Sequence, residues 1–136
     1  MSTIHLGSDS EYVKITLNPP FTSEGWCHAH VEISASCFHG QIEPWVEAFD
    51  IESFSSQLAI VYDTLQGEAK LAPREEQLAL CVQAGTGGHI QVKGIAWSKA
   101  TYENRLEFTL ELDQSFLPRT LTQLREVVSR SQASKK

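Results

Sequence analysis

Apolar and polar residues alternate with a period of two over much of this 136-residue chain. The clearest run covers residues 105–112, where Leu106, Phe108, Leu110 and Leu112 alternate with Arg105, Glu107, Thr109 and Glu111. Successive side chains of a strand point to opposite faces of a sheet, so this pattern predicts one core face and one wet face. The alternation therefore restricts the chain to folds built around sheets that are apolar on one side.

Further strands are predicted from the same signal. Residues 12–17 alternate until Asn18-Pro19-Pro20 stops the run, and residues 38–45 form another strand in which Pro44 indicates an edge or an exit. The short runs 68–72 and 77–82 flank a turn at residues 73–76 and predict a hairpin. A strand at residues 90–97 contains Gly94, which permits a bulge and a change of face.

Two helices are expected near residues 50–66 and 115–129. In the first, Asp50 is the predicted N-cap, Phe49 and Phe54 a hydrophobic staple and Gly67 the C′ residue, and the apolar stripe is Ile51, Phe54, Leu58, Val61 and Leu65. In the second, Ser115 is the predicted N-cap, Pro118 lies in the first turn, and the stripe is Leu117, Leu121, Leu124 and Val128. About eight strands with short connections and two helices predict a single α+β domain, mainly antiparallel, over residues 1–136.

The charges are distributed unevenly along the chain. Residues 1–118 hold 16 acidic and 6 basic residues, a net charge of −10, whereas residues 119–136 carry +4. An acidic body repels phosphate backbones and attracts basic proteins, which argues against nucleic acid as a partner. The basic end, residues 130–136, is expected to be a disordered, solvated tail.

Composition also indicates the compartment. No apolar run approaches the ~18 residues that span a bilayer, and the N-terminus lacks the basic and apolar regions of a signal peptide. Three cysteines, Cys27, Cys37 and Cys81, are an odd number without C-x-x-C spacing, which favours reduced thiols in the core over a disulfide framework. A cytoplasmic protein is expected, without contact to membranes.

Residues 25–40 contain three histidines and two cysteines. If they form a strand, Cys27, Ala29, Val31, Ile33 and Ala35 line the core, and Trp26, His28, His30, Glu32 and Ser34 face the other way. Two histidines two residues apart on one strand can bind Zn²⁺, with His39 or Glu32 as a third ligand. The alternative is a row of exposed imidazoles on the wet face of a sheet, and we favour it because the cysteines point away from His28.

Other chemical motifs are incomplete. The glycine-rich Gly85-Thr86-Gly87-Gly88 lacks the lysine and the following helix of a phosphate-binding loop, and a hairpin turn that uses positive φ explains it. No G-x-S-x-G elbow is present, and the paired Glu75-Glu76 lies in a turn open to solvent. We therefore predict no catalytic residue and no cofactor.

The order of several segments resembles the WapI-type immunity proteins. The similar blocks are Val31-Glu32-Ile33 before Phe38-His39-Gly40, Asp50 to Phe54, Leu65 to Leu71, Gly88 to Gly94, Leu106 to Phe108, and Leu112 to Leu117, which together span about residues 27–128. The resemblance implies a small bacterial cytoplasmic protein that neutralises the toxic domain of a polymorphic toxin. It implies a binder and no catalytic residues.

Three hypotheses follow, in order of preference. The first is an acidic immunity protein that binds a protein toxin domain, such as a basic nuclease, and occludes its active surface. The second is a metal-dependent or hydrolytic enzyme that uses His28 and His30. The third is a self-associating scaffold that forms a homodimer through a strand edge near Trp45. Aromatic and acidic residues on the wet face are the predicted partner-binding residues: Trp26, His28, His30, Glu32, Glu43 and Trp45.

Overall fold

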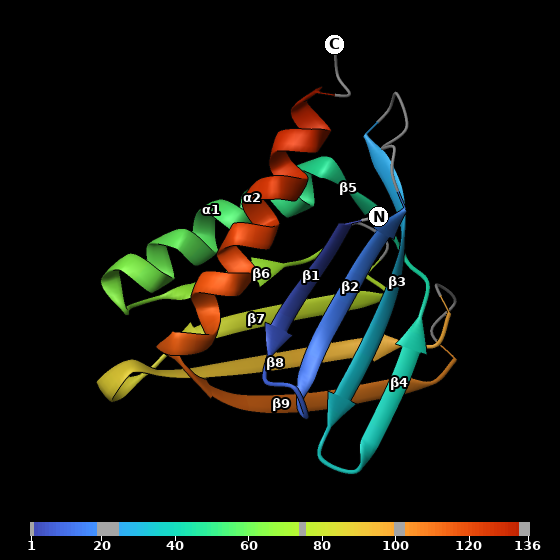
Figure 1. Cartoon of the computed structure of the whole chain (residues 1–136). Coiled ribbons are helices and arrows are strands. Elements are labelled where there is room, and N and C mark those ends of the chain that lie inside the picture. Colours follow the sequence, from blue (N-terminus) through green and yellow to red (C-terminus); the bar gives the residue numbers. More distant parts are fainter. Residues whose placement is uncertain (1, 19–24, 74–75, 100–102, 134–136) are drawn as a thin grey trace.

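The computed structural model of the chain describes residues 2–18, 25–73, 76–99 and 103–133. Within these ranges, nine strands and two α-helices follow one another in a repeated order, in which a set of strands and a helix is followed by a second set and a second helix (Figure 1). The predicted α+β class with mainly antiparallel sheets is confirmed. The strands number one more than expected.

The N-terminal sheet has five antiparallel strands. Four of them lie in the order β1-β2-β3-β4, and the short β5 pairs with the first residues of β3, whereas β4 pairs with its last residues. Their bounds are β1 Ser2–Gly7, β2 Tyr12–Asn18, β3 Trp26–Ala35, β4 Phe38–Ile42 and β5 Trp45–Glu47. The predicted single strand over residues 38–45 is therefore wrong, because the chain breaks at Glu43-Pro44. The carbonyl of Pro44 accepts a hydrogen bond from the Ala29 amide (2.9 Å) at this break.

Strand β1 was not predicted from the sequence. It contributes only Ile4 and Leu6 to the core, too short an alternation to be recognised alone. Its pairing with β2 runs without interruption from Ser2–Leu17 to Gly7–Tyr12. Tertiary pairing, rather than local pattern, defines this strand.

Helix α1, Ala48–Thr64, begins two residues before Asp50, the predicted N-cap. Glu47 is the N-cap, and it forms a capping box in which the Asp50 carboxylate accepts a hydrogen bond from the Glu47 amide (3.1 Å). Asp50 as N-cap is therefore wrong, and so is the staple, because the Phe49 side chain is 71% exposed. The helix ends on Leu65 in the left-handed conformation (φ 54°), so Gly67 is not its C′ residue.

The C-terminal sheet follows α1 and contains four antiparallel strands in chain order: β6 Glu68–Leu71, β7 Leu78–Ala84, β8 His89–Trp97 and β9 Arg105–Asp113. The predicted hairpin of β6 and β7 is confirmed, although residues 74–75 of its turn lie outside the described part. The glycine-rich segment turns β7 into β8 with positive φ at Gly87 (67°) and Gly88 (80°), as expected.

Gly94 does not produce the expected bulge. Strand β8 keeps an unbroken register with both neighbours, and Ile90, Val92 and Ala96 all lie on its buried face. The glycine is required for a different reason: a Cβ atom at position 94 would lie 2.2 Å from Cζ of Phe108, its cross-strand partner. The missing side chain makes room for the aromatic ring.

Helix α2, Leu117–Ala133, follows a 3₁₀ turn over Gln114–Phe116. Asp113 caps this turn by accepting a hydrogen bond from the Ser115 amide (2.8 Å), so Ser115 is not the N-cap. The buried stripe is Leu117, Leu121, Leu124 and Val127, whereas Val128 is half-buried. The helix continues to Ala133 rather than ending near Ser129, and residues 134–136 lie outside the described part.

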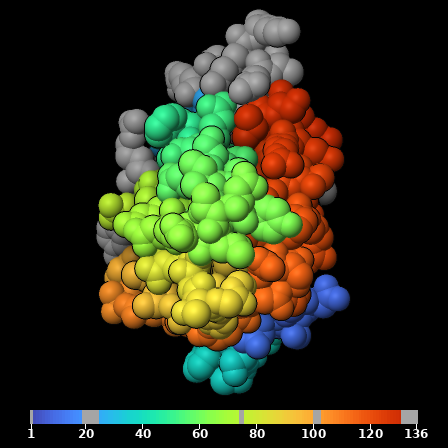
Figure 2. Space-filling view, turned by 90° about the vertical axis from the view of Figure 1, so that its left-hand side faces the viewer, coloured from blue at the N-terminus to red at the C-terminus, as the bar shows by residue number. Residues whose placement is uncertain are grey.

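The two sheets lie face to face with crossing strands, and both helices lie along one side of them (Figures 1 and 2). Each helix packs against the first strand of the other half: α1 contacts β6, and α2 contacts β1. The buried side chains of all these elements form one hydrophobic cluster. Neither helix, over the described residues, has the length and apolar character needed to cross a bilayer.

Candidate functional site

The outer face of β3 carries four of the predicted partner-binding residues. Cys27, Ala29 and Val31 are buried in the core, so the alternating residues Trp26, His28, His30 and Glu32 lie on the opposite, half-buried face. Ser34 has the same parity but is buried, because its hydroxyl donates to the Ser10 carbonyl (2.9 Å). The wet face predicted from the alternation therefore ends at Glu32.

The other two predicted residues lie beside this row. Trp45 on β5 pairs with His28, and the two rings lie 4.9 Å apart at an angle of 36°. Glu43, in the break between β4 and β5, has a carboxylate oxygen 3.7 Å from Nδ1 of His30, and a Glu32 oxygen lies 3.7 Å from Nε2 of the same ring. Six residues from three segments thus form one continuous surface, the β3–β5 patch.

Neighbouring strands extend the β3–β5 patch. On β2, Lys14 lies opposite Glu32 and Thr16 opposite His30. On β1, His5 pairs with Lys14, and its ring stacks on Tyr12 at 4.9 Å. His39 on β4 has the same parity, so four of the five histidines of the chain share this face. Sequence reasoning missed the residues on β1 and β2, because only strand pairing brings them next to β3.

A polar hollow of about 480 Å³ borders the patch where the two sheets meet. Its walls are His30, Gln41, Ile42, Glu43, Gln77, Ser98 and Lys99. Lys99 is paired with Glu103 (3.3 Å), and Gln77 donates to the backbone carbonyl of Trp97 (3.2 Å). The hollow therefore adjoins both acidic and basic side chains, which can contact a polar partner.

The positions of the histidines do not favour a metal site. Among the described residues, no group of three His, Cys, Asp or Glu side chains is placed to hold a metal ion. His28 contacts an indole ring instead of a potential ligand, and His39 lies at the far end of β4. The described part of the chain therefore provides no set of ligands for the metal hypothesis, in which His28 and His30 bind an ion together with His39 or Glu32.

The prediction that all three cysteines line the core is wrong for two of them. Cys27 is buried, and burial raises the pKa of its thiol. Cys37 is exposed in the turn between β3 and β4. Cys81 lies on the outer face of the C-terminal sheet, where partial burial and then the Glu68 carboxylate raise the pKa of its thiol.

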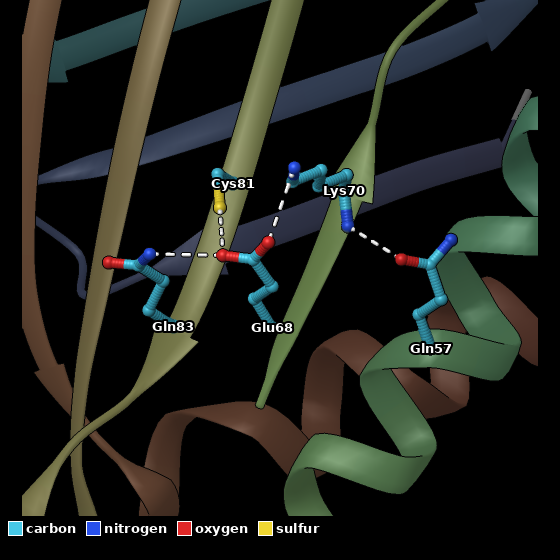
Figure 3. A network of polar contacts seen from close by, with 5 residues as sticks. All are labelled: Gln57, Glu68, Lys70, Cys81 and Gln83. Atoms are coloured by element: carbon cyan, nitrogen blue, oxygen red, sulfur yellow. Dashed lines mark hydrogen bonds and ion pairs between the residues drawn. The ribbon is translucent and has the colours of Figure 1, made fainter. Parts of the chain in front are cut away.

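The outer face of the C-terminal sheet is occupied by polar contacts within the sheet. Figure 3 shows Glu68 between Gln83 and Lys70, with the Cys81 thiol directed at the same carboxylate. Gln57 reaches from α1 to the backbone amide of Lys70 (3.0 Å). Beside this network is an open hollow of about 560 Å³, lined by apolar residues such as Ala79 and Ile95 together with charged ones such as Lys93.

Exposed apolar residues were missed by the sequence reasoning. Phe38, Trp45, Phe49 and Ile60 are 61%, 43%, 71% and 61% exposed. Phe49 and Ile60 lie on α1, and Phe38 begins β4. The helical period could have identified Ile60, which lies outside the predicted stripe of α1, whereas no such signal separates Phe38 from core residues of the same type. Only Trp45 was predicted to be on the surface.

These features define a small two-sheet α+β protein with aromatic, imidazole and carboxylate side chains gathered on one outer sheet face. The model of the immunity protein WapI-like family matches residues 4–131, and the chain belongs to that family. The resemblance seen in the sequence is thereby confirmed.

Other comparisons add little. No curated protein matches the chain. One solved structure that is similar to it is described as "Crystal structures of trypanosoma bruciei MRP1/MRP2"; the sequences are 8% identical, the alignment covers 97% of this chain and 83% of that chain, and the TM-score is 0.49.

Proposed function

We propose that this protein neutralises a bacterial toxin domain by binding to it and occluding its active surface. The observation that carries the proposal is membership of the immunity protein WapI-like family over residues 4–131. Immunity proteins act by complex formation, so the proposal requires a binding surface and no catalytic residue of this chain. The proposal also implies that the complex forms in the cytoplasm.

The β3–β5 patch is the proposed toxin-binding surface. Trp45 is 43% exposed, and aromatic side chains contribute much of the binding energy of protein interfaces. Glu43 and Glu32 lie on either side of His30, and their side chains are 66% and 36% exposed. Their carboxylates are about 3.7 Å from the imidazole, beyond hydrogen-bonding distance, so a cationic partner can engage them.

The charge of the chain supports a basic toxin, for which a nuclease domain is the leading candidate. The whole chain carries −6, and residues 1–118 carry −10. Complementary charge steers association and raises on-rates toward ~10⁸ to 10⁹ M⁻¹s⁻¹ at low salt. The association rate with the toxin should therefore fall steeply as salt concentration increases.

The test uses the toxin domain encoded beside the gene, inactivated by mutation, and measures its affinity by calorimetry. Glu43→Lys and Trp45→Ala should each weaken binding by at least tenfold, because they remove an exposed charge and an exposed aromatic side chain from the patch. The matched control is Glu107→Lys on the outer face of the C-terminal sheet, where the Glu107 side chain is 57% exposed. This control should bind as the unmodified protein does.

Two results would contradict the proposal in different ways. If no complex forms at micromolar concentration and the protein does not protect cells from the toxin, the immunity function is wrong. If a tight complex forms and Glu107→Lys weakens it while Glu43→Lys does not, the function holds and the binding surface is on the other sheet.

A further inference from the structure

Two of the four sheet edges are covered by the helices. At β1, the amide of His5 donates to Gln123 on α2 (2.6 Å), and the buried Thr120 donates its hydroxyl to the His5 carbonyl (2.6 Å). At β6, the amide of Lys70 donates to Gln57 on α1 (3.0 Å). An edge strand presents unpaired backbone groups that can template another strand, and side chains of the helices occupy these groups.

The third edge, β9, is protected by charge. Its exposed side chains are Arg105, Glu107, Thr109, Glu111 and Asp113. A second copy of β9 paired antiparallel about Thr109 would place Glu107 opposite Glu111, a destabilising pair of like charges, and Arg105 opposite Asp113, a favourable pair. Charged side chains on an edge strand are a common protection of free edges in natural sheets.

The fourth edge, β4, has neither protection. In the described part of the chain it pairs with β3 alone, and its sequence Phe-His-Gly-Gln-Ile contains no Asp, Glu, Lys or Arg. Its first residue, Phe38, is 61% exposed, and its third is Gly40, which lacks a side chain. Half of the backbone groups of an antiparallel edge strand point away from its partner, so β4 presents a short free hydrogen-bonding edge.

We infer that the β4 edge receives an extended segment of the protein partner, which adds a strand to the N-terminal sheet. This inference rests on the proposed function, because the partner is the toxin domain. In such an addition, backbone hydrogen bonds supply affinity and the side chains of the added strand supply specificity. Glu43 directly follows β4, so the edge is continuous with the β3–β5 patch.

The surroundings of β4 define the chemistry of the incoming segment. Its side chains on the core-facing side would lie next to Phe38, which favours an apolar residue there. On the outer side they would lie next to His39 and Gln41, and Gln41 in turn lies opposite Glu32 on β3. With Glu43 at the end of the edge, a Lys or Arg on the outer side of the segment is favoured.

A second copy of this chain is a poorer occupant. Five residues of β4 span only ~17 Å, whereas a stable interface buries roughly 1,200 to 2,000 Å². Both copies would also carry −6, so their net charges repel. A basic toxin domain is instead attracted by the negative charge of this chain. It can also contact the adjoining β3–β5 patch, which provides the additional buried interface area.

Hydrogen exchange in the complex tests the inference. With the inactivated toxin domain bound, the outward-facing amides of residues 38–42 should exchange at least tenfold more slowly than in the free protein. The amides on the free edge of β9 should not change. Unaltered exchange at residues 38–42 in a stable complex would overturn the inference and leave the proposed function intact.

Substitutions give an independent measurement. Phe38→Lys and Gln41→Lys place charge on the β4 edge and should weaken toxin binding at least tenfold. The matched controls are Phe49→Lys on α1, at a phenylalanine that is 71% exposed, and Thr109→Lys on β9; both should bind normally. Circular dichroism confirms that each variant is folded.

The remaining outcomes are also decisive. Normal binding by both Phe38→Lys and Gln41→Lys would overturn the inference. If the free protein sediments as a dimer that Phe38→Lys dissociates, the occupant is a second copy and the inference is wrong. If no complex with the toxin forms at all, the proposed function fails, and the inference fails with it.

Discussion

The two halves of the molecule repeat one order of elements but use their outer sheet faces differently. On the C-terminal sheet, charged side chains are paired within the sheet: Arg105 lies 2.9 Å from Glu107, and Gln91 donates to Glu111 (2.9 Å). On the N-terminal sheet, the closest contacts between His30 and its two carboxylates are 3.7 Å, and Trp45 is 43% exposed. The polar contacts of these residues are therefore shorter on the first face than on the second.

The pKa values of two carboxyls agree with this contrast. On the C-terminal sheet, a hydrogen bond from Gln83 and then the Lys70 ammonium lower the pKa of Glu68 below its ordinary value. A hydrogen bond from Gln91 is the largest contribution that lowers the pKa of Glu111. Such contacts stabilise the ionised form of these carboxylates within the sheet.

The largest expected effect sharpens the comparison between the two sheets. Gly94→Ala should reduce the free energy of unfolding by ~3 kcal/mol, because the new Cβ would lie 2.2 Å from the ring of Phe108. The matched control is Gly40→Ala in the N-terminal sheet, whose Cβ would lie 3.5 Å from Leu106; its effect should stay within ~0.5 kcal/mol. Urea denaturation measures both.

A second variant separates steric clash from other effects of Gly94→Ala. Adding Phe108→Leu to it should recover part of the lost stability, since the smaller side chain makes room for the methyl group. Equal destabilisation by Gly94→Ala and Gly40→Ala would show that the two sheets tolerate added volume alike, which contradicts the prediction.

An intermediate effect is expected where α2 covers the edge of β1. Thr120→Val should cost about 1 to 2 kcal/mol, because it keeps the shape of the buried side chain and leaves the His5 carbonyl without the hydroxyl that donates to it. Thr122→Val, on the exposed side of the same helix, is the control, since its hydroxyl donates to the Pro118 carbonyl of its own helix (3.0 Å). Thermal denaturation should separate the two variants, and coincident curves would argue against the helix as the cover of this edge.

The smallest effect concerns the cap before α2. Hydrogen bonds from the Ser115 hydroxyl and amide hold the pKa of Asp113 below its ordinary value. A depressed native pKa adds stability that is present above the unfolded pKa and is lost as pH falls through the native one. Ser115→Ala should therefore raise the Asp113 midpoint toward the ordinary value of 3.8, as followed by carboxyl NMR titration.

The control for this titration is Ser129→Ala, at an exposed position on α2 away from the cap. It should leave the Asp113 midpoint unchanged. An unaltered midpoint in Ser115→Ala would mean that the hydroxyl does not lower the pKa of Asp113.

The elements that the sequence predicts well are those with strong local patterns. The alternations over residues 12–17 and 105–112 became β2 and β9, and the stripe from Ile51 to Val61 became the buried side of α1. The helix ends were less predictable: Asp50 and Ser115 are both good capping residues, yet the residues that cap are Glu47 and Asp113. Competing caps differ by little free energy, so packing at each helix end decides between them.

The residues of the candidate site were also predictable only in part, because they come from several strands and the sequence does not show which strands are neighbours. Period two alone placed Trp26, His28, His30 and Glu32 on one face of a strand. The sequence could not show that Lys14 and His5 share that face, since this depends on the registers of β1, β2 and β3. It also placed Cys37 and Cys81 in the core, because an apolar residue in a strand pattern looks the same whether or not another layer covers it.

By itself, the sequence determined both helices and most of the strands, the side of each long strand that is apolar and the acidic charge of the chain. These properties follow from spacing and composition within one segment. Tertiary structure decided which strands are neighbours, which sheet edges the helices cover and which edge, β4, has one strand neighbour among the described residues. Strand register and helix docking depend on contacts between residues distant in the chain, and no local pattern records them.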